Sequence, residues 1–395
     1  SDESCGNPWG LRFLQGLFNM ASDSGLFRTR AQLEAQGCKR EGNHFAGKQE
    51  RLLPLFEAKM VHHFDHRFAT YEGATQANLN KGTLPQASDQ QHSNPDFAAT
   101  PEYWVDSAEV ATRLEDRWSQ GWLLGWRDIT NAHNERTVIA SLIPRAAVGH
   151  KLPLMLPAQQ PSVVACLYAS LCSFALDYAA RQKVGGTSLT YFIVKQLPVL
   201  APSVYGAATA WDRGVLLRDW VLARVLELTY TAWDLEPFAK GCLESANGEW
   251  RTGSGEQGTV EGERGMANSE PQTGLAGYWQ QYSPHSPFAV RRSPLAPSSP
   301  PPFRWDAQRR FLLRCELDAA FFHLYGLNRD DTACVMDTFP IVRKHDEKEH
   351  GEYRTKRAIL EIYDAMAEAV RSGHPYATRL DPPPADPACC HPSKP

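Results

Sequence analysis

The chain has 395 residues, of which 42% are hydrophobic and 22% are charged, and its formal net charge is −4. The length allows two or three domains, and the composition is that of a globular protein with a sizeable core. The acidic balance excludes a chain that binds nucleic acid over its whole surface, and no apolar run is long enough to span a membrane, so no membrane partner is expected.

The start of the chain carries no targeting signal. Ser1-Asp2-Glu3-Ser4 has neither the basic part nor the apolar part of a signal peptide, and the first residue is not Met. The nine cysteines form no CxxC pair, which favours a reducing compartment. We therefore expect a fragment of a longer cytoplasmic protein, with residues 1–50 as a lead-in that contains one short helix at 33–37.

Residues 51–203 are predicted to form the main domain. Near its start, Met60, Phe64 and Phe68 are spaced four residues apart. This spacing predicts one apolar helix face if residues 52–71 are helical.

His62 and His66 are also four residues apart, and Asp65 lies beside them. Two histidines at this spacing on a helix can hold a metal ion, so a metal-dependent hydrolase or nuclease that uses these three residues is the alternative function. The Glu that follows the first His in HExxH is missing, and the sequence offers no obvious third ligand. A polar face on a buried element is the preferred interpretation, and no metal site is assigned.

The polar residues 72–101 are predicted to be a loop. The loop contains Asn94-Pro95-Asp96-Phe97, which differs from the Asn/Asp-Pro-Pro-aromatic motif of amino-methyltransferases because Asp96 replaces the second Pro. In that motif the first side chain and a prolyl carbonyl accept hydrogen bonds from the target amino group. No strand followed by a Gly-rich cofactor loop precedes it. We therefore predict that this chain has no catalytic residues of its own.

Three tryptophans follow a short helix expected at 108–118. Trp118, Trp122 and Trp126 are spaced four residues apart. An exposed indole can stack on an unpaired base, but aromatic side chains more often pack in a core. We therefore expect these three side chains to lie in the core.

The segment 126–200 differs from the rest of the chain in charge. It has seven Lys or Arg and three acids, a local balance of 7 − 3 = +4 in a chain of −4. Such a basic island suits a phosphate backbone. Polar strands are expected at 127–131 and 134–140, a helix at 162–182, and an apolar strand at 189–194 after a Gly-Gly turn.

This segment supplies both chemistries that are needed to read a DNA duplex. Lys, Arg and backbone N–H groups hold phosphates, whereas Arg, Asn, Gln, Ser and Thr read base edges. We expect Lys183 to contact a phosphate, and Asn134 or Arg136 to contact a base edge. The alternative is a β-rich domain with a charged solvent face and a plain hairpin turn. The candidate DNA-binding residues are Arg127, Asn131, Asn134, Arg136, Arg145, His150, Lys151, Lys183, Gly185, Gly186, Thr187, Ser188 and Lys195.

The rest of the chain is predicted to be helical in two places. Residues 204–242 form a helical connector whose arginines lie on a solvated face, and residues 303–375 form a small helical domain. Residues 243–302, rich in Gly, Ser and Pro, and the tail 376–395 are predicted to be disordered, because neither can bury enough apolar surface to offset chain entropy.

Two helices are expected in the last domain, at 307–325 and 353–372, with Gly373 ending the second. The second helix opens with three basic residues, which either touch phosphates or pair with neighbouring glutamates. The basic residues are Arg354, Lys356 and Arg357, and the glutamates are Glu352 and Glu361.

Taken together, several of these segments resemble the target-recognition region of adenine-specific DNA methyltransferases of restriction–modification and phage-defence systems, of the type IIG-like kind. The matching segments are scattered over about Asn7 to Met366, and their order along the chain is the specific signal. They are Pro54–Met60, His62–Phe68, Arg127–Asn131, Asn134–Ala140, Gln182–Thr187, Gln196–Leu200, Asp337–Val342 and Gly351–Arg357.

The resemblance implies an α+β fold, in which a mixed β-sheet target-recognition domain with packed helices is followed by a small helical C-terminal domain. It implies sequence-specific DNA recognition for adenine-N6 methylation, with the DNA positioned for a catalytic domain outside this chain. This chain would hold no cofactor, whereas the catalytic domain of the parent protein would bind S-adenosylmethionine. The expected partners are double-stranded DNA, the methyltransferase domain of the same parent protein and other subunits of the defence system.

Overall fold

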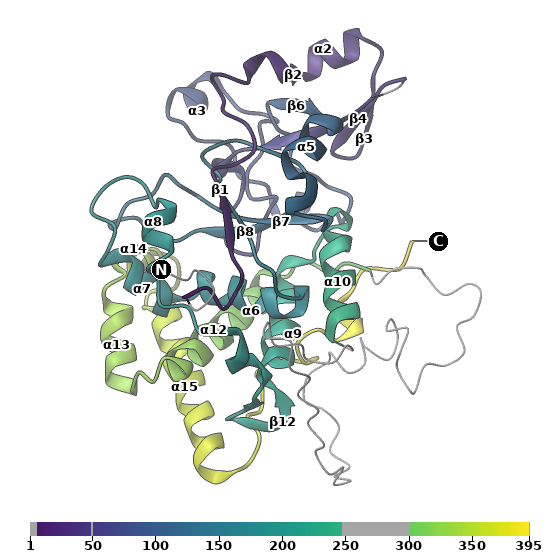
Figure 1. Cartoon of the computed structure of the whole chain (residues 1–395). Helices are drawn as coiled ribbons and strands as arrows, with labels where there is room; N and C mark the ends of the chain where they lie inside the picture. The colour runs from purple at the N-terminus through teal and green to yellow at the C-terminus, as the bar shows by residue number, and fades with distance from the viewer. Residues whose placement is uncertain (1–5, 49, 247–300, 395) are drawn as a thin grey trace, which may run out of the picture.

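The computed structural model describes residues 6–48, 50–246 and 301–394. Antiparallel sheets and helices combine in an α+β fold, which confirms the fold class expected from the sequence (Figure 1). Most of the insertion predicted at 243–302 lies outside the described residues, so the prediction of disorder stays a prediction there.

A four-stranded antiparallel sheet lies at the centre of the molecule, with the strand order β1-β10-β7-β8 (Figure 1). Its strands are β1 (Arg12–Leu14), β7 (Trp122–Trp126), β8 (Ala140–Pro144) and β10 (Leu154–Leu156). All five residues of β7 are buried, so this strand is apolar throughout instead of alternating. Trp118, Trp122 and Trp126 are 8%, 1% and 0% exposed, which confirms that they pack in the core.

The polar strands expected at 127–131 and 134–140 are not formed. β7 ends at Trp126 and β8 begins at Ala140, and the residues between them form a loop. Polar side chains bond to the backbone within this loop, as in the hydrogen bond of 2.7 Å that the Thr130 hydroxyl donates to the carbonyl of Thr137. Such local bonds compete with strand pairing.

A second sheet lies at the top of Figure 1, with the strand order β2-β6-β5-β4-β3 and with β9 paired in parallel to β5. It has a small core of its own around Leu33 and Trp104. The segment predicted to be a lead-in is therefore more than that, because its described residues 6–48 supply strands to both sheets. The strands of the second sheet are β2 (Arg28–Thr29), β3 (Lys39–Glu41), β4 (His44–Ala46), β5 (Arg51–Phe56), β6 (Tyr103–Asp106) and β9 (Ala147–Val148).

The helix considered at 52–71 is not formed. Its first residues form β5, which pairs with β4 and β6, and a short 3-10 helix, η2 (Ala58–Met60), follows. Pro54 has no N–H to donate in a helix, and Phe64 takes a positive φ of 57°, so helical geometry is broken at both places. Long-range strand pairing overrides the four-residue spacing of the apolar side chains.

The helix expected at 162–182 is formed as two helices, α6 (Pro161–Cys172) and α7 (Phe174–Arg181), which bend by 56° at their junction. Ser173 causes the break, because its hydroxyl accepts a hydrogen bond of 3.3 Å from the N–H of Leu176 and so caps the second helix. Every residue of α6 after its first is buried, which places this helix in the middle of the core.

The apolar strand expected at 189–194 is not formed either, because Tyr191–Val194 is a single helical turn, α8. The strand-like contacts of this segment come just before α8: Ser188 forms a β-bridge with Ile129, and Leu189 N–H donates to the carbonyl of Asp128. Residues 189–194 belong to none of the sheets in the described part of the chain.

The predicted connector belongs to the core. Its main helix, α9 (Leu217–Thr229), packs against α6, and α10 (Glu236–Ala246) follows. The expectation that its arginines are solvated is wrong for Arg218 and Arg224, which are 6% and 1% exposed. Arg224 is tolerated there because Glu316 faces it at 2.8 Å.

The helices predicted near the end of the chain are confirmed. α12 (Ala307–Leu324) and α15 (Arg354–Ser372) match the two expected ranges, and Gly373 ends α15 in the left-handed conformation with a φ of 76°. Between them lie α13 (Arg329–Asp337) and α14 (Pro340–His350).

Two of the three basic residues that open α15, Lys356 and Arg357, pair with acids, as in the second of the two interpretations, whereas Arg354 lies over the ring of Phe311 and forms no ion pair in the described ranges. Arg357 lies 2.7 Å from Glu352 and 3.0 Å from Glu361, and Lys356 lies 2.7 Å from Asp337. These side chains are therefore already neutralised within the helical domain.

The prediction that 376–395 is disordered is wrong for the described residues up to 394. Tyr376, Leu380 and Cys390 are buried, and Cys390 forms a β-bridge with Phe303. Three prolines in succession lead to the prediction of disorder. The segment needs no secondary structure of its own, because it lies against α9 and α12, where Tyr376 donates to Glu316.

In the described residues no single helix is long and apolar enough to cross a membrane, and the bent pair α6–α7 passes that test by length and composition only.

The remaining elements are short. They are η1 (Ser24–Leu26), α2 (Arg30–Ala35), α3 (Gln76–Asn80), α4 (Asp89–His92), α5 (Ser107–Leu114), η3 (Glu115–Arg117), η4 (Pro202–Gly206), β11 (Ala208–Thr209), β12 (Asp212–Leu216), η5 (Trp233–Leu235) and η6 (Pro387–Cys389).

Candidate nucleic-acid interface

Two loops of the basic segment, 128–134 and 183–190, lie side by side. Thr130 N–H donates to the carbonyl of Thr187 at 3.1 Å, and Leu189 N–H donates to that of Asp128 at 2.7 Å. The indole of Trp126 in β7 donates to the carbonyl of Leu189 at 2.7 Å, which fixes the pair of loops to the central sheet. The structure thus brings together seven candidate residues: Asn131, Asn134, Lys183, Gly185, Gly186, Thr187 and Ser188.

Next to these loops, a surface groove of about 780 Å³ runs between β1 and α8. Lys195 lies over two rings in it, 5.6 Å from the ring centroid of Phe13 and 5.5 Å from that of Tyr191. Lys151 also lines the groove and forms an ion pair of 2.9 Å with Asp128. We call the two loops together with this groove the loop–α8 surface.

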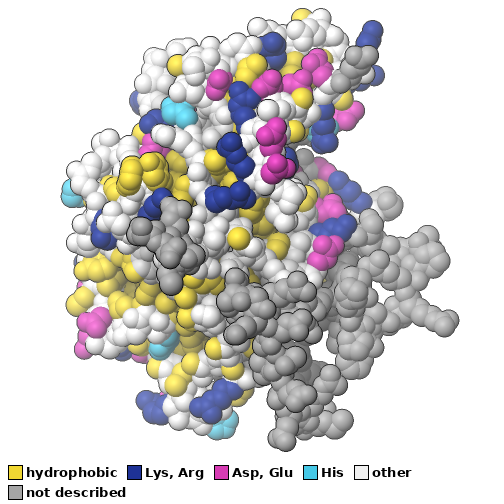
Figure 2. Space-filling model, in the orientation of Figure 1, with side chains coloured by type: hydrophobic (Ala, Val, Ile, Leu, Met, Phe, Trp, Pro, Cys, Tyr) yellow, Lys and Arg dark blue, Asp and Glu magenta, His cyan; other side chains and the backbone are white. Residues whose placement is uncertain are grey.

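Exposed apolar side chains gather on the loop–α8 surface. Of the six large hydrophobic residues that are exposed in the described chain, three lie here: Ile129, Tyr191 and Phe192. The rings of Tyr191 and Phe192 stack with centroids 4.3 Å apart, and Phe192 is 63% exposed. Figure 2 shows hydrophobic side chains at the surface around the position of α8. Sequence reasoning missed these aromatics because two adjacent rings in an apolar run suggested a buried strand.

Four other candidate residues lie inside the protein or bind it. Arg127 donates to the carbonyl of Val61 at 2.8 Å, and burial lowers the pKa of its guanidinium to about 10. Arg145 donates to the carbonyl of Trp118 at 2.9 Å, and the ring of His150 accepts from the N–H of Met20 at 3.2 Å. These groups hold the loops of the core in place.

Arg136 is the fourth. It is 8% exposed, and it donates to Asp177 at 2.8 Å and to the carbonyl of Cys172 at 2.6 Å. Its guanidinium also lies over the ring of Phe174, with the carbon 4.1 Å from the centroid. The expectation that Arg136 reads a base edge is therefore not supported by its position.

Gly185 and Gly186 lie at the exposed tip of the second loop. Neither has a positive φ, and a Cβ on either would meet no heavy atom within 4 Å. The turn itself therefore does not require glycine. What the two glycines provide is an uncovered backbone that another molecule can approach closely.

The residues of the alternative function do not converge. Asp65 bonds to His92 at 3.0 Å, whereas His66 bonds to Asp234 at 2.8 Å, and His62 packs on the ring of Phe68 with centroids 4.8 Å apart. Over the described ranges, no group of three or more His, Cys, Asp or Glu is placed to hold a metal ion. The cluster holds the core together.

Burial, together with the charge of Arg127, lowers the pKa of His62 to about 3. The unfolded chain has a His pKa of about 6.5, so between these values the unfolded state binds the extra proton and folding stability falls as the pH falls. Replacing His62 by Phe keeps an aromatic ring at this position but removes the group that takes up a proton on unfolding. The melting temperature of His62→Phe should therefore drop less than that of the wild type between pH of about 7 and 5. An equal drop in both proteins would contradict this assignment.

Comparison of the chain with protein-family models, curated proteins and solved structures found no match.

Proposed function

We propose that this chain recognises double-stranded DNA through the loop–α8 surface. The observation that carries the proposal is the clustering, on one exposed surface, of amides, hydroxyls and lysines beside stacked aromatic rings. Asn131, Asn134 and Thr187 offer donors and acceptors for base edges, and Lys183 and Lys195 offer charge for phosphates. The rings of Tyr191 and Phe192 offer apolar contact with bases or thymine methyl groups.

The proposed biological role rests on the resemblance of the sequence to the target-recognition region of adenine-specific DNA methyltransferases. We propose that the chain is the specificity module of an adenine-N6 DNA methyltransferase in a restriction–modification or phage-defence system. In this role it binds no cofactor itself, and it positions DNA for a methyltransferase domain of the same parent protein, which binds S-adenosylmethionine in the cytoplasm. Other subunits of the defence system are further partners.

The proposal predicts different effects for a phosphate contact and a base contact. Lys195→Ala should weaken binding by a similar factor on all duplexes, and should make the slope of log affinity against log salt shallower by about one unit. Phe192→Ala should weaken binding without changing the salt slope, since it removes no charge. The measurement is a titration of labelled duplexes, first selected from a random library, at several salt concentrations.

The matched control is Arg371→Ala, which also removes one positive charge, from a distant side chain that is 77% exposed on α15. It should leave affinity and slope nearly unchanged. If all three variants bind DNA like the wild type, or if Arg371→Ala lowers the affinity for DNA as much as Lys195→Ala does, the loop–α8 surface is not the DNA contact.

A further inference from the structure

The exposed rings of the loop–α8 surface offer a contact that an intact duplex cannot use fully. In a duplex each base is covered above and below by its neighbours, so a protein reaches only the base edges and the backbone. Phe192 is 63% exposed and stacks on Tyr191 with centroids 4.3 Å apart, so the pair presents a flat apolar surface. Such surfaces bind the faces of unstacked bases. The two rings therefore fit a base that lies outside the stack better than a paired one.

The groove beside these rings has room for such a base. Its volume is about 780 Å³, which is within the range that proteins use for small molecules, and Phe13 of β1 lines it on the side opposite α8. Lys195 lies 5.6 Å from the ring centroid of Phe13 and 5.5 Å from that of Tyr191. Its ammonium group is thus held at the groove, where it can bind the phosphate next to the base.

Asp128 places a buried carboxylate at the same groove. Its side chain is 10% exposed, and its Oδ2 accepts from Lys151 at 2.9 Å. Its backbone is fixed as well, because its N–H donates to the carbonyl of Lys151 at 3.1 Å and its carbonyl accepts from Leu189 N–H at 2.7 Å. The second oxygen, Oδ1, accepts no hydrogen bond within the described part of the chain and is not closed off from solvent. This oxygen is an acceptor left for a ligand.

A carboxylate at this position distinguishes between bases, because it accepts hydrogen bonds and cannot donate them. It binds the exocyclic amino group that adenine, cytosine and guanine carry. It repels thymine, whose one ring N–H lies between two carbonyl oxygens. Ser188 and Thr190 also line the groove, but a hydroxyl both donates and accepts, so it does not select among bases.

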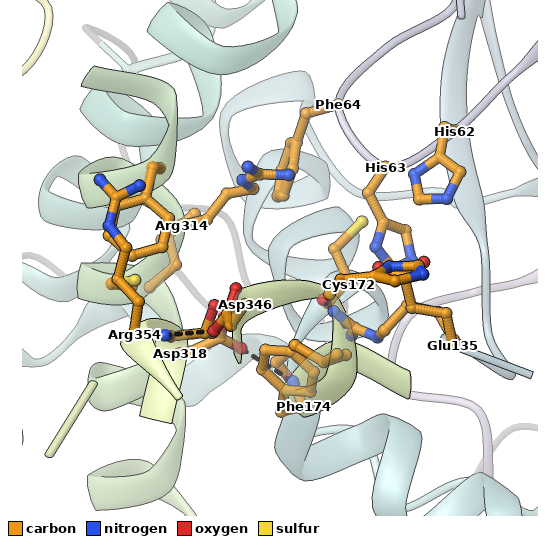
Figure 3. A pocket seen from close by; sticks show the side chains of 18 of the residues that line it. His62, His63, Phe64, Glu135, Cys172, Phe174, Arg314, Asp318, Asp346 and Arg354 are labelled. Atoms are coloured by element: carbon orange, nitrogen blue, oxygen red, sulfur yellow. Dashed lines mark hydrogen bonds and ion pairs between the residues drawn. The ribbon is translucent and has the colours of Figure 1, made fainter. Parts of the chain in front are cut away.

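The pocket shown in Figure 3 is not a second site of this kind. Its volume is about 320 Å³, and it shares no lining residue with the groove. Its rings are already covered, since Arg136 lies 4.1 Å from the ring centroid of Phe174 and Arg354 lies 4.0 Å from that of Phe311. Both acids and arginines line it, so it selects neither sign of charge. Of the two, the groove is the one beside an uncovered ring.

We propose that the groove of the loop–α8 surface holds one unpaired base of the DNA, stacked on the rings of α8, with its exocyclic amino group bonded to Asp128. The inference rests on the proposed function and adds to it the form of DNA that binds most tightly. A base that is already unpaired need not be pulled out of the stack, so DNA with such a base should bind more tightly than a perfect duplex.

The test compares three duplexes of one sequence: a perfect duplex, one with a single bulged cytosine and one with a single bulged thymine. Titration of the labelled duplexes with the wild-type chain gives the three affinities without any variant. The cytosine bulge should bind about tenfold more tightly than the perfect duplex. It should also bind about tenfold more tightly than the thymine bulge, because only cytosine has the amino group.

Two variants assign the two contacts. Asp128→Asn presents an amide that can donate to a thymine carbonyl, so the ratio of the affinities for the two bulges should fall to about one. A general effect of the lost charge would change both affinities equally and leave this ratio unchanged. Phe192→Ala should remove the preference for a bulge over the perfect duplex. The matched control is Asp364→Asn on α15, where the side chain is 47% exposed, and it should keep the wild-type ratio.

The outcomes separate this inference from the proposed function. If the perfect duplex binds and the bulged duplexes bind no more tightly, if the two bulges bind alike, or if Asp128→Asn keeps the wild-type ratio, the inference is overturned while duplex recognition stands. If bulged DNA binds and the perfect duplex does not, the unpaired base is the ligand and the proposed recognition of intact duplexes is wrong. If no DNA binds, both are overturned.

Discussion

Replacing Glu316 by Ala is expected to cost about 3–5 kcal/mol of the free energy of unfolding, because it leaves a buried charge without a partner. Glu316 and Arg224 are each 1% exposed and lie 2.8 Å apart. Burial lowers the pKa of Arg224, and the charge of Glu316 opposes this by raising it, so the carboxylate helps to keep the guanidinium charged. The same carboxylate accepts hydrogen bonds from Tyr376 at 2.8 Å and from Thr378 at 2.5 Å. The substitution should therefore also release the segment after α15 from the core.

Urea denaturation followed by tryptophan fluorescence measures this loss. The control is Asp364→Ala, which breaks an ion pair with Arg329 in which the two side chains are 47% and 53% exposed. A pair so exposed contributes at most about 1 kcal/mol. Equal losses in the two variants would show that the buried pair contributes no more than an exposed one.

Asp177→Ala is the second substitution with a large expected effect, and it connects stability to the proposed interface. Asp177 is fully buried and accepts from Arg136 at 2.8 Å, from the N–H of Thr137 at 2.9 Å and from the N–H of Val138 at 2.7 Å. Its removal leaves a buried cation and two buried N–H groups without an acceptor. We expect a loss of about 3–5 kcal/mol in the free energy of unfolding.

Because these bonds anchor the end of the loop that carries Asn131 and Asn134, the variant should also lose DNA affinity at temperatures where it is still folded. Hydrogen exchange should become faster at the amides of Thr137 and Val138 than at amides of the second sheet. The isosteric Asp177→Asn keeps an acceptor and should lose less of both properties. Unchanged exchange at these two amides would mean that Asp177 does not anchor the loop.

Short-range signals in the sequence were sufficient for several elements. α12 and α15 lie where the apolar period placed them, and Gly373 ends α15, because a helix depends on residues within one or two turns of each other. The burial of Trp122 and Trp126 was also predictable, since large rings rarely remain at the surface. The α+β class followed from the resemblance to a known family.

The tertiary structure decided which charges are available to a ligand. Arg136 and Lys195 belong to one basic segment and look equivalent in the sequence. Arg136 is neutralised by a residue 41 positions away, whereas Lys195 lies on an open groove. No local pattern records such a partner, because ion pairing depends on contacts between distant segments.

By itself, the sequence determined the elements whose stabilising contacts are local: the long C-terminal helices, their ends and the apolar residues of the core. Only the tertiary structure decided that residues 51–56 form a strand, that residues 191–194 form a helical turn, and that the tail is ordered. In each case the deciding contacts come from far along the chain: β6 beside β5, the loop 128–134 beside the loop before α8, and Glu316 beside Tyr376. The free energy of such contacts exceeds the local preference of a few residues.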